Sequence, residues 1–259
     1  MPLCHMLLLC LAVAAPQPTP VVVDYAASLT ATMEGPIAAA LLREQNVRFQ
    51  GEGKGSKALA NMIAAGLRTP DVFVSADPAL VEDLEHKNLI ASSAILGSAS
   101  MVLGFAPSSP HAAQLQAAGG DARRMLDALD NSSLRLGRTD PAIDPKGSRT
   151  VRALEILGTM AGEPEKAQRI LRAAQIFPEE DLAVRVQTGE LDAGFFYSLE
   201  TGPAKLRAVD LPGDASLRGK IQYSIAILKA AAHPDAARSF VAFVLHGAGR
   251  SILRDAGLR

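Results

Sequence analysis

Cysteine and aromatic residues are scarce in this chain, and each shortage excludes a kind of function. Among 259 residues there are two cysteines, Cys4 and Cys10, and no tryptophan. Both cysteines lie in the first twenty residues, so a chain that loses this segment has no disulfide, thiolate nucleophile or cysteine metal site. Aromatic residues make up 4% of the chain, which disfavours recognition of carbohydrates or nucleobases by stacking.

The chain also lacks a large net charge of either sign. The chain has 26 Lys and Arg against 27 Asp and Glu, for a net charge of −1. It therefore has no basic field for nucleic acid and no polybasic patch for a membrane surface, and we expect neither partner. Hydrophobic residues make up 48% of the chain, as in soluble globular proteins. The length allows one large domain or two small lobes.

Residues 1–20 are predicted to be an export leader. The apolar stretch Met6–Ala15 is too short to span a bilayer, and Ala12-Val13-Ala14 supplies the small residues of a cleavage site. No Lys or Arg precedes that stretch, which leaves a hydrophobic tail open as the alternative, and Cys10 leaves a lipid anchor open. We expect a periplasmic or extracellular protein, either free or anchored to the membrane.

Strands and helices alternate along the rest of the chain. Alternation at this spacing is typical of a doubly wound, parallel sheet. The predicted strands are Val21–Asp24, Val47–Gln50, Asp71–Ser75, Ser100–Ala106, Leu134–Arg138, Asp192–Tyr197, Leu206–Leu211 and Tyr223–Leu228. The predicted helices are Met33–Gln45, Ser56–Gly66, Pro78–Lys87, His111–Leu129, Ser148–Ala161, Pro164–Ala174, Glu180–Thr188, Pro234–His246 and Gly249–Ala256.

The order of these elements indicates a chain that crosses twice between two lobes. We predict one lobe from residues 21–99 and 222–259, and a second from residues 100–221. Each is expected to be a mostly parallel sheet flanked by helices, in an α/β fold of the periplasmic-binding-protein type. Strand C-termini and helix N-termini would face the cleft between the lobes, where ligands bind in open α/β sheets.

Two short turns carry hydroxyl groups at predicted helix starts. Tyr25–Thr30 contains Ser28 and follows an apolar strand, and Gly55-Ser56 opens the next helix. Helix N-termini present unpaired N–H groups and a positive dipole end. Two of them converging on one point would hold an anion without cationic side chains. Serine is also an ordinary helix cap, which is the structural alternative for both residues.

Four segments in order resemble the molybdate/tungstate-binding proteins of ABC importers, a two-lobe family of solute-binding proteins. They are Tyr25–Thr30, Gly55–Ala60, Asp71–Pro78 and Leu136–Gly147, supported by Gly189–Ser198 and Tyr223–Gly257. The resemblance implies a non-enzymatic protein that binds a small inorganic oxyanion, needs no cofactor, is a monomer and delivers its ligand to the membrane subunits of an ABC permease.

The resemblance also implies roles for individual residues. Ser28 and Ser56 match serines that donate hydrogen bonds to the oxyanion, and Tyr197 matches a tyrosine that closes the site from the second lobe. Lys146 matches a residue whose backbone N–H points at the anion, with no role required of its ammonium. Glu179, or its neighbour Glu180, falls by spacing alone where a helix start offers its N–H.

Asp144 is ambiguous within this resemblance. An Asp at this position and a Glu in a later strand complete a six-coordinate metal in one branch of the family. Here the Glu position is Phe196, so one carboxylate is missing. A tetrahedral, hydrogen-bonded anion is favoured, with Asp144 either a direct ligand to the metal or a turn-former before Pro145.

A site made only of donors would suit a dianion, which has acceptors only, and would reject a protonated anion of the phosphate kind. The first alternative is the same fold binding sulfate or another small anion. A cleft-facing Arg138 or Arg149 would favour a carboxylate ligand. The second is a cytoplasmic anion-sensing regulatory protein, which would need a DNA-binding segment. No catalytic motif stands out: the chain has no Gly-x-Ser-x-Gly elbow, and its histidines lack metal spacing.

Overall fold

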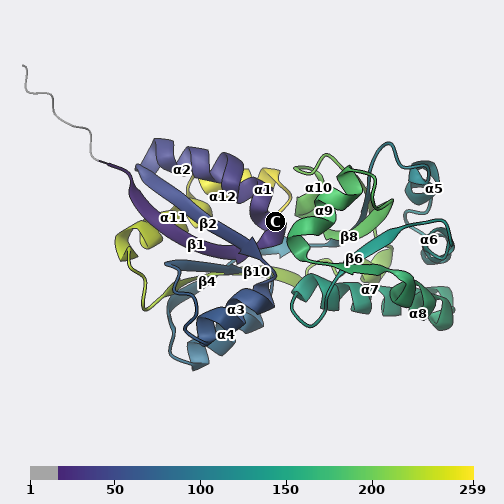
Figure 1. Cartoon of the computed structure of the whole chain (residues 1–259), viewed down its shortest axis with the longest axis horizontal. Helices are drawn as coiled ribbons and strands as arrows, with labels where there is room; N and C mark the ends of the chain where they lie inside the picture. The colour runs from purple at the N-terminus through teal and green to yellow at the C-terminus, as the bar shows by residue number, and fades with distance from the viewer. Residues whose placement is uncertain (1–16) are drawn as a thin grey trace, which may run out of the picture.

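The computed structural model describes residues 17–259, so most of the predicted leader lies outside the described residues. Within them the chain forms two five-stranded sheets, which lie side by side and are each flanked by helices on both faces (Figure 1). We call the first sheet with its helices lobe 1 and the second sheet with its helices lobe 2. The α/β two-lobe fold predicted from the sequence is confirmed.

Lobe 1 is built on a sheet of order β2-β1-β3-β10-β4. Its strands β2, β1 and β3 are parallel, whereas β10 runs antiparallel to β3 and β4. Because β10 comes late in the chain, the last part of the sequence returns to the sheet formed by the first. The strands are β1 (Thr19–Ala26), β2 (Val47–Lys54), β3 (Val72–Ser75), β4 (Ile90–Ala99) and β10 (Ile221–Leu228).

Lobe 2 repeats this arrangement with the order β7-β6-β8-β5-β9. Its strands β7, β6 and β8 are parallel, and β5 is antiparallel to both β8 and β9. The strands are β5 (Met101–Phe105), β6 (Leu136–Thr139), β7 (Gln175–Phe177), β8 (Ala193–Tyr197) and β9 (Arg207–Asp210).

Helices cover both faces of each sheet, with α3 and α4 below β10 and β4 in Figure 1 and α7 and α8 below the sheet of lobe 2. The lobe 1 helices are α1 (Thr30–Thr32), α2 (Ala38–Gln45), α3 (Ser56–Ala64), α4 (Pro78–His86), α11 (Pro234–His246) and α12 (Ala248–Asp255). The lobe 2 helices are α5 (Ala112–Ala117), α6 (Ala122–Leu129), α7 (Pro145–Ala161), α8 (Pro164–Ala173), α9 (Glu179–Gln187) and α10 (Ser198–Thr201). Single turns lie at Ala27–Leu29 (η1) and Gly213–Ser216 (η3), and a π-helical turn at Met33–Ile37 (η2).

The strands of lobe 2 separate their side chains between two apolar layers. In β8, Phe195 and Tyr197 join the large core, whereas Phe196 lies under α9 with Leu182 and Val186. Such alternation follows from the two-residue period of a strand. This alternation buries all three aromatic side chains. Tyr197, at the end of β8, packs against Tyr223 of lobe 1, at the boundary between the lobes.

The structure corrects several details of the sequence prediction. Each sheet is mostly parallel, as predicted, but contains one antiparallel strand that was not predicted, β10 in lobe 1 and β5 in lobe 2. The single helix predicted over His111–Leu129 is two helices, α5 and α6, separated around Gly119-Gly120, where Gly120 has a φ of +81°. Strands β4 and β7 were not predicted. No helix among residues 17–259 is both long and apolar enough to cross a bilayer.

Candidate functional site

The two serine turns follow strands that end at the same edge of the lobe 1 sheet. Tyr25 in β1 pairs with Gly53 in β2 and with Val74 in β3, so the three strands finish together. Ser28 lies in the turn after β1 and Ser56 begins α3 directly after β2. Both side chains are buried.

The hydroxyl groups of these serines hold neighbouring strands in place. The Ser28 hydroxyl lies 2.8 Å from the phenol oxygen of Tyr223 in β10. The Ser56 hydroxyl accepts a 3.1 Å hydrogen bond from the N–H of Ala76, at the end of β3. Each serine therefore has a structural partner, and a direct role for either in ligand binding stays a prediction.

Asp144 and Lys146 form the start of α7 on the facing edge of lobe 2. Asp144 is the N-cap residue, and its Oδ1 accepts a 2.9 Å hydrogen bond from the Lys146 N–H. The resemblance implied that the Lys146 backbone N–H binds the anion. In the structure this N–H donates to the Asp144 side chain that caps the helix. Gly147 is required here, because a Cβ at this position would lie 2.5 Å from the Asp140 carbonyl carbon.

The Lys146 side chain is fully buried, which was not predicted from the sequence. Its ammonium lies 2.6 Å from Glu200 Oε1 and 3.3 Å from Glu179 Oε1. Burial lowers the pKa of Lys146, but the surrounding carboxylates outweigh burial and hold this pKa above its ordinary value. The ammonium therefore stays charged, and the site contains a cation as well as helix N-termini.

Buried polar atoms without a hydrogen-bond partner gather around this lysine. They include both carboxyl oxygens of Glu179, Asp144 Oδ2 and the Tyr197 hydroxyl. Burial raises the pKa of the Glu179 and Asp144 carboxyls and of the Tyr197 phenol. Carboxyl groups therefore lie beside the expected donors, and that the ligand meets donors alone stays a prediction.

Two residues of this cluster were missed by sequence reasoning. Glu200 accepts a 2.6 Å hydrogen bond from the Tyr197 N–H through Oε2 while Oε1 binds Lys146. A Glu three residues after a helix N-cap is a recognisable capping signal, which could have identified it. Tyr223 packs edge-on against Tyr197, with ring centroids 5.9 Å apart. It was predicted only as part of an apolar strand.

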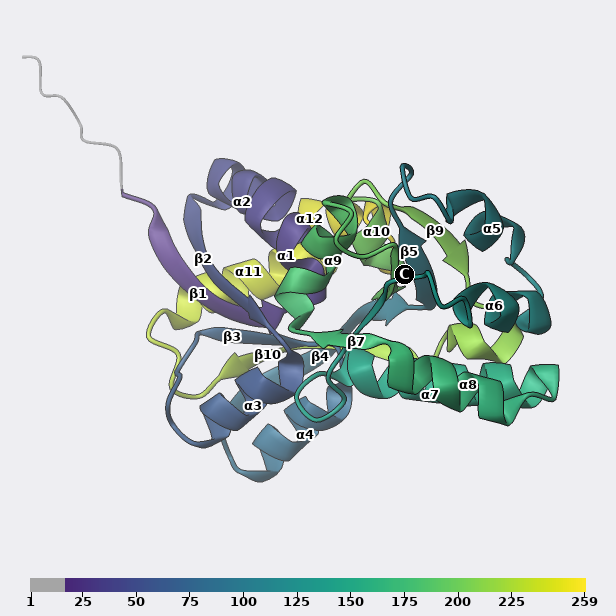
Figure 2. The ribbon, with the colours of Figure 1, turned by 45° about the vertical axis from the view of Figure 1, so that its right-hand side comes forward.

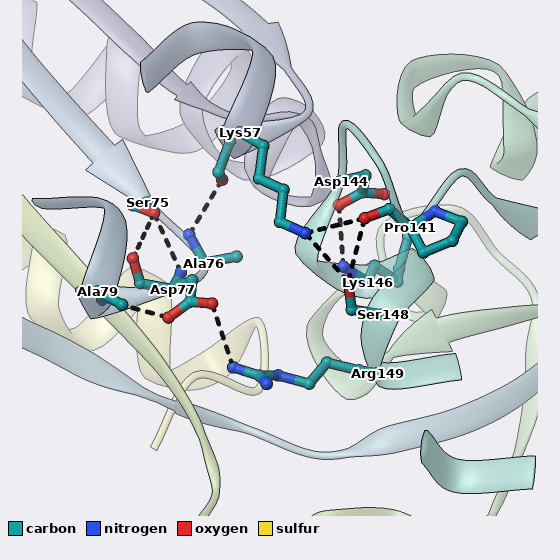
Figure 3. Close-up of polar contacts among 11 residues, drawn as sticks. Lys57, Ser75, Ala76, Asp77, Ala79, Pro141, Asp144, Lys146, Ser148 and Arg149 are labelled. Atoms are coloured by element: carbon teal, nitrogen blue, oxygen red, sulfur yellow. Dashed lines mark hydrogen bonds and ion pairs between the residues drawn. The ribbon is translucent and has the colours of Figure 1, made fainter. Parts of the chain in front are cut away.

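The N-termini of α3 and α7 meet across the boundary between the lobes (Figure 3). The Lys57 ammonium donates to the Pro141 carbonyl oxygen at 2.8 Å and to the Ser148 hydroxyl at 3.2 Å. The Ala58 N–H donates to the Ile143 carbonyl at 3.2 Å. These contacts between lobe 1 and lobe 2 describe a closed arrangement.

The two arginines that would favour a carboxylate ligand are both engaged by the protein. Arg149 makes a 3.4 Å ion pair across the lobes with Asp77. Arg138 donates to the carbonyl oxygens of Leu171 and Thr139, each at 3.3 Å. Arg149 Nε is nevertheless buried without a hydrogen-bond partner, so Arg149 stays a candidate for holding a ligand carboxylate.

A cavity of about 240 Å³ lies at the mouth of the boundary. Ser28 and Ala31 line it from lobe 1, and Glu179, Glu180 and Glu200 line it from lobe 2. Figure 2 shows the start of α9 beside the end of β2, at this boundary. Two of its lining residues, Glu179 and Glu200, are the acids that pair with the Lys146 ammonium.

The structure thus brings the predicted residues to one place. Ser28 shares the cavity with Glu179, and a Cβ at Gly55, next to Ser56, would lie 3.4 Å from the Asp144 Cβ. Glu179 in turn contacts Lys146, whose ammonium lies 5.8 Å from the centre of the Tyr197 ring.

The chain matches known proteins both in sequence and in fold. A family model described as "Bacterial extracellular solute-binding protein" matches residues 21–259. A putative ABC transporter molybdenum-binding protein of Haloferax volcanii is 31% identical over 150 residues, which are 58% of this chain and 47% of that protein, so the match spans about half of its length. A molybdate/tungstate-binding protein of Pyrococcus abyssi is 24% identical over 257 residues, covering 81% of this chain and 74% of that one. The structure of the Azotobacter vinelandii periplasmic molybdate-binding protein has the same fold, with a TM-score of 0.72 at 17% identity over 92% of this chain and 98% of that one.

Proposed function

Because the chain belongs to the family of bacterial extracellular solute-binding proteins, we propose that it captures molybdate or tungstate outside the cytoplasm and delivers it to an ABC permease. The family is one of binding proteins, which confirms the expectation that the chain is not an enzyme. The names of the Haloferax and Pyrococcus relatives support the choice of ligand.

The observation that carries this proposal is the meeting of two helix N-termini across the lobes. Helix α3 begins at Ser56 in lobe 1 and α7 begins after Asp144 in lobe 2. Each start contributes the positive end of a helix dipole, which favours an anion lying between them. Ser28 and Tyr197 add buried hydroxyl groups on either side, and Lys146 adds a buried positive charge.

Hydrogen bonds to a charged group contribute about 1.5–3 kcal/mol each. Five to seven of them, less the cost of desolvation and of closing the lobes, would give binding in the micromolar to nanomolar range, on the order of 8–12 kcal/mol. Selectivity over sulfate would arise from the size of the enclosed space, because metal–oxygen bonds in molybdate and tungstate are longer than the bonds in sulfate.

Closure of the lobes provides the mechanism. In the open form one lobe offers Ser28 and Ser56 to the ligand, and closure adds Tyr197 and the start of α7 from the other lobe. The contacts of Lys57 with Pro141 and Ser148 form at the same step. The closed form is the one that would dock on the permease, as a monomer.

Titration calorimetry with molybdate, tungstate and sulfate tests the proposal. We expect tight binding of the first two anions and sulfate binding weaker by a hundredfold or more, about 2.7 kcal/mol. Equal affinity for sulfate would overturn the choice of ligand and favour a general anion binder. Binding of none of the three would overturn the function.

A further inference from the structure

The Glu179 carboxyl is a buried acid that the proposed hydrogen-bond scheme does not use. It belongs to the first residue of α9, and its side chain is 1% exposed. Its Oε1 lies 3.3 Å from the Lys146 ammonium, yet neither carboxyl oxygen has a hydrogen-bond partner. The carboxyl also lines the cavity that Ser28 borders from the other lobe.

The charges around Glu179 do not balance. The Lys146 ammonium is held closest by Glu200 at 2.6 Å, and the second oxygen of Glu200 binds the Tyr197 N–H. Asp144 is a further buried carboxyl with one unpartnered oxygen. One ammonium therefore lies among three buried acids, of which it pairs with Glu200 and, at the longer distance, with Glu179. A buried carboxylate that lacks hydrogen bonds is costly to keep ionised.

An oxyanion entering this site adds further negative charge. A carboxylate facing it would repel it, whereas a carboxylic acid can donate its proton to an oxyanion oxygen in a short, charge-assisted hydrogen bond. A protonated Glu179 would donate one hydrogen bond to the oxyanion, and this bond would give a partner to both groups. Protonation of Glu179 would also leave Lys146 facing two carboxylates, Glu200 and Asp144, in place of three.

We propose that Glu179 holds the oxyanion as a neutral carboxylic acid, so that closing the lobes over a fully deprotonated oxyanion takes up one proton from solution. This inference rests on the proposed function and assigns a side-chain role in place of the backbone N–H suggested by the resemblance. The proton stays covalently bound to the Glu179 carboxyl. The ligand remains a dianion and accepts a hydrogen bond from this O–H.

The neighbours of Glu179 favour its protonated form. Burial raises the pKa of Glu179 well above its ordinary value and the nearby Asp144 raises it further, while Lys146 opposes them. Strand β2, which also contacts α9, brings Glu52 and Lys54, which pair with each other at 3.4 Å. The titratable or charged groups on the other elements that pack here are Asp144, Lys146 and Arg149 on α7, Arg138 on β6, Tyr197 on β8, Glu200 on α10 and Tyr223 on β10.

The sign of the pH dependence follows from this arrangement. In the open form Glu179 would border water and be ionised at neutral pH like an ordinary glutamate, whereas in the closed form it would keep its proton. The closed, occupied state thus binds more protons, and raising the pH disfavours it. Affinity is expected to fall by up to about tenfold for each pH unit between the open-state and closed-state pKa values.

Calorimetric titration of the full chain with molybdate at pH 7.5, in buffers that differ in ionisation enthalpy, counts the protons exchanged. The wild-type protein is expected to take up about one proton per anion. Glu179→Gln keeps the shape and an N–H donor, so it is expected to bind within about tenfold of wild type and to take up none. Asp181→Asn changes another acid in the first turn of α9, one that pairs with Arg185 at 3.7 Å, and should retain the uptake.

The outcomes separate this inference from the proposed function. If wild-type protein binds molybdate with no proton exchange, or if Glu179→Gln still takes up a proton, the inference is overturned while the proposed function stands. If neither molybdate nor tungstate binds, both are overturned. The wild-type measurement needs no variant, so a folding defect in Glu179→Gln does not remove the test.

Discussion

The ammonium of Lys57 in lobe 1 donates a 2.8 Å hydrogen bond to the carbonyl oxygen of Pro141 in lobe 2. The same ammonium reaches the Ser148 hydroxyl, at the start of α7. These bonds can form only when the lobes are closed, so they contribute to the closed state without requiring contact with the ligand. Ligand affinity depends on how readily the binding-competent state forms.

Replacing Lys57 by Met should therefore weaken oxyanion binding without altering the fold. Half-buried hydrogen bonds of this kind contribute about 1 kcal/mol, which corresponds to about a fivefold loss of affinity. Calorimetry gives the affinity, and small-angle scattering reports the closed fraction. Lys54→Met is the matched control, because Lys54 pairs with Glu52 within the same strand. Equal losses in both variants would contradict a role for Lys57 in closure.

Gly55→Ala should block closure sterically. The backbone at Gly55 has a φ of −54° and a ψ of 127°, which alanine adopts without strain. A Cβ there would nevertheless lie 2.8 Å from the Ile143 carbonyl oxygen of lobe 2. We expect wild-type thermal stability of lobe 1 with at least about a tenfold loss of anion affinity, near 1.4 kcal/mol. Gly35→Ala, where a Cβ meets nothing within 4 Å, is the control; unchanged affinity in Gly55→Ala would mean that the bound form is more open.

Ser28→Ala should reduce anion affinity more than Arg149→Gln. A hydrogen bond from a serine hydroxyl to a charged ligand contributes about 1.5–3 kcal/mol to binding, or roughly ten- to a hundredfold in affinity. The Arg149 to Asp77 pair is partly exposed, at 30% and 22%, so its loss should cost under about 1 kcal/mol. The opposite ranking in calorimetry would favour a carboxylate-bearing ligand held by the arginine.

Lys146→Met should destabilise the fold itself. Removing one partner of a buried ion pair leaves uncompensated charge and costs about 3–5 kcal/mol. Denaturant unfolding measures this loss. The double variant Lys146→Met with Glu200→Gln should recover part of the lost stability, because it also removes the carboxylate that would otherwise be buried without its ammonium partner. If Lys146→Met unfolds with wild-type stability, the ammonium is not the charge that holds this cluster together.

Much of the fold could be predicted because periodicity and turn residues mark its elements. The strands that lead into Ser28 and Ser56 were predicted from their apolar runs, and Asp77-Pro78 marked the start of α4. Strand β4 was missed because its exposed edge carries serines in place of an alternating apolar pattern. The antiparallel entry of β10 was missed because strand direction depends on contacts distant in sequence.

The candidate residues were predicted to lie near one another, but the buried charges between them were not predicted. Ser28, Ser56, Asp144, Glu179 and Tyr197 come to one boundary, as helix starts and strand ends suggested. Burial of a lysine side chain cannot be inferred from a turn motif of Asp, Pro, Lys and Gly, which usually lies at the surface. The pairing of the Lys146 ammonium with Glu200, 54 residues away, could emerge only from the folded chain.

Anomalous diffraction from crystals grown with tungstate tests the central claim most directly, because tungsten scatters strongly and marks the ligand without ambiguity. One tungsten peak per chain is expected, enclosed between the turns of Ser28 and Ser56 and the phenol of Tyr197, with Glu179 beside it. A peak on the outer surface of either lobe, or at the arginines alone, would contradict it.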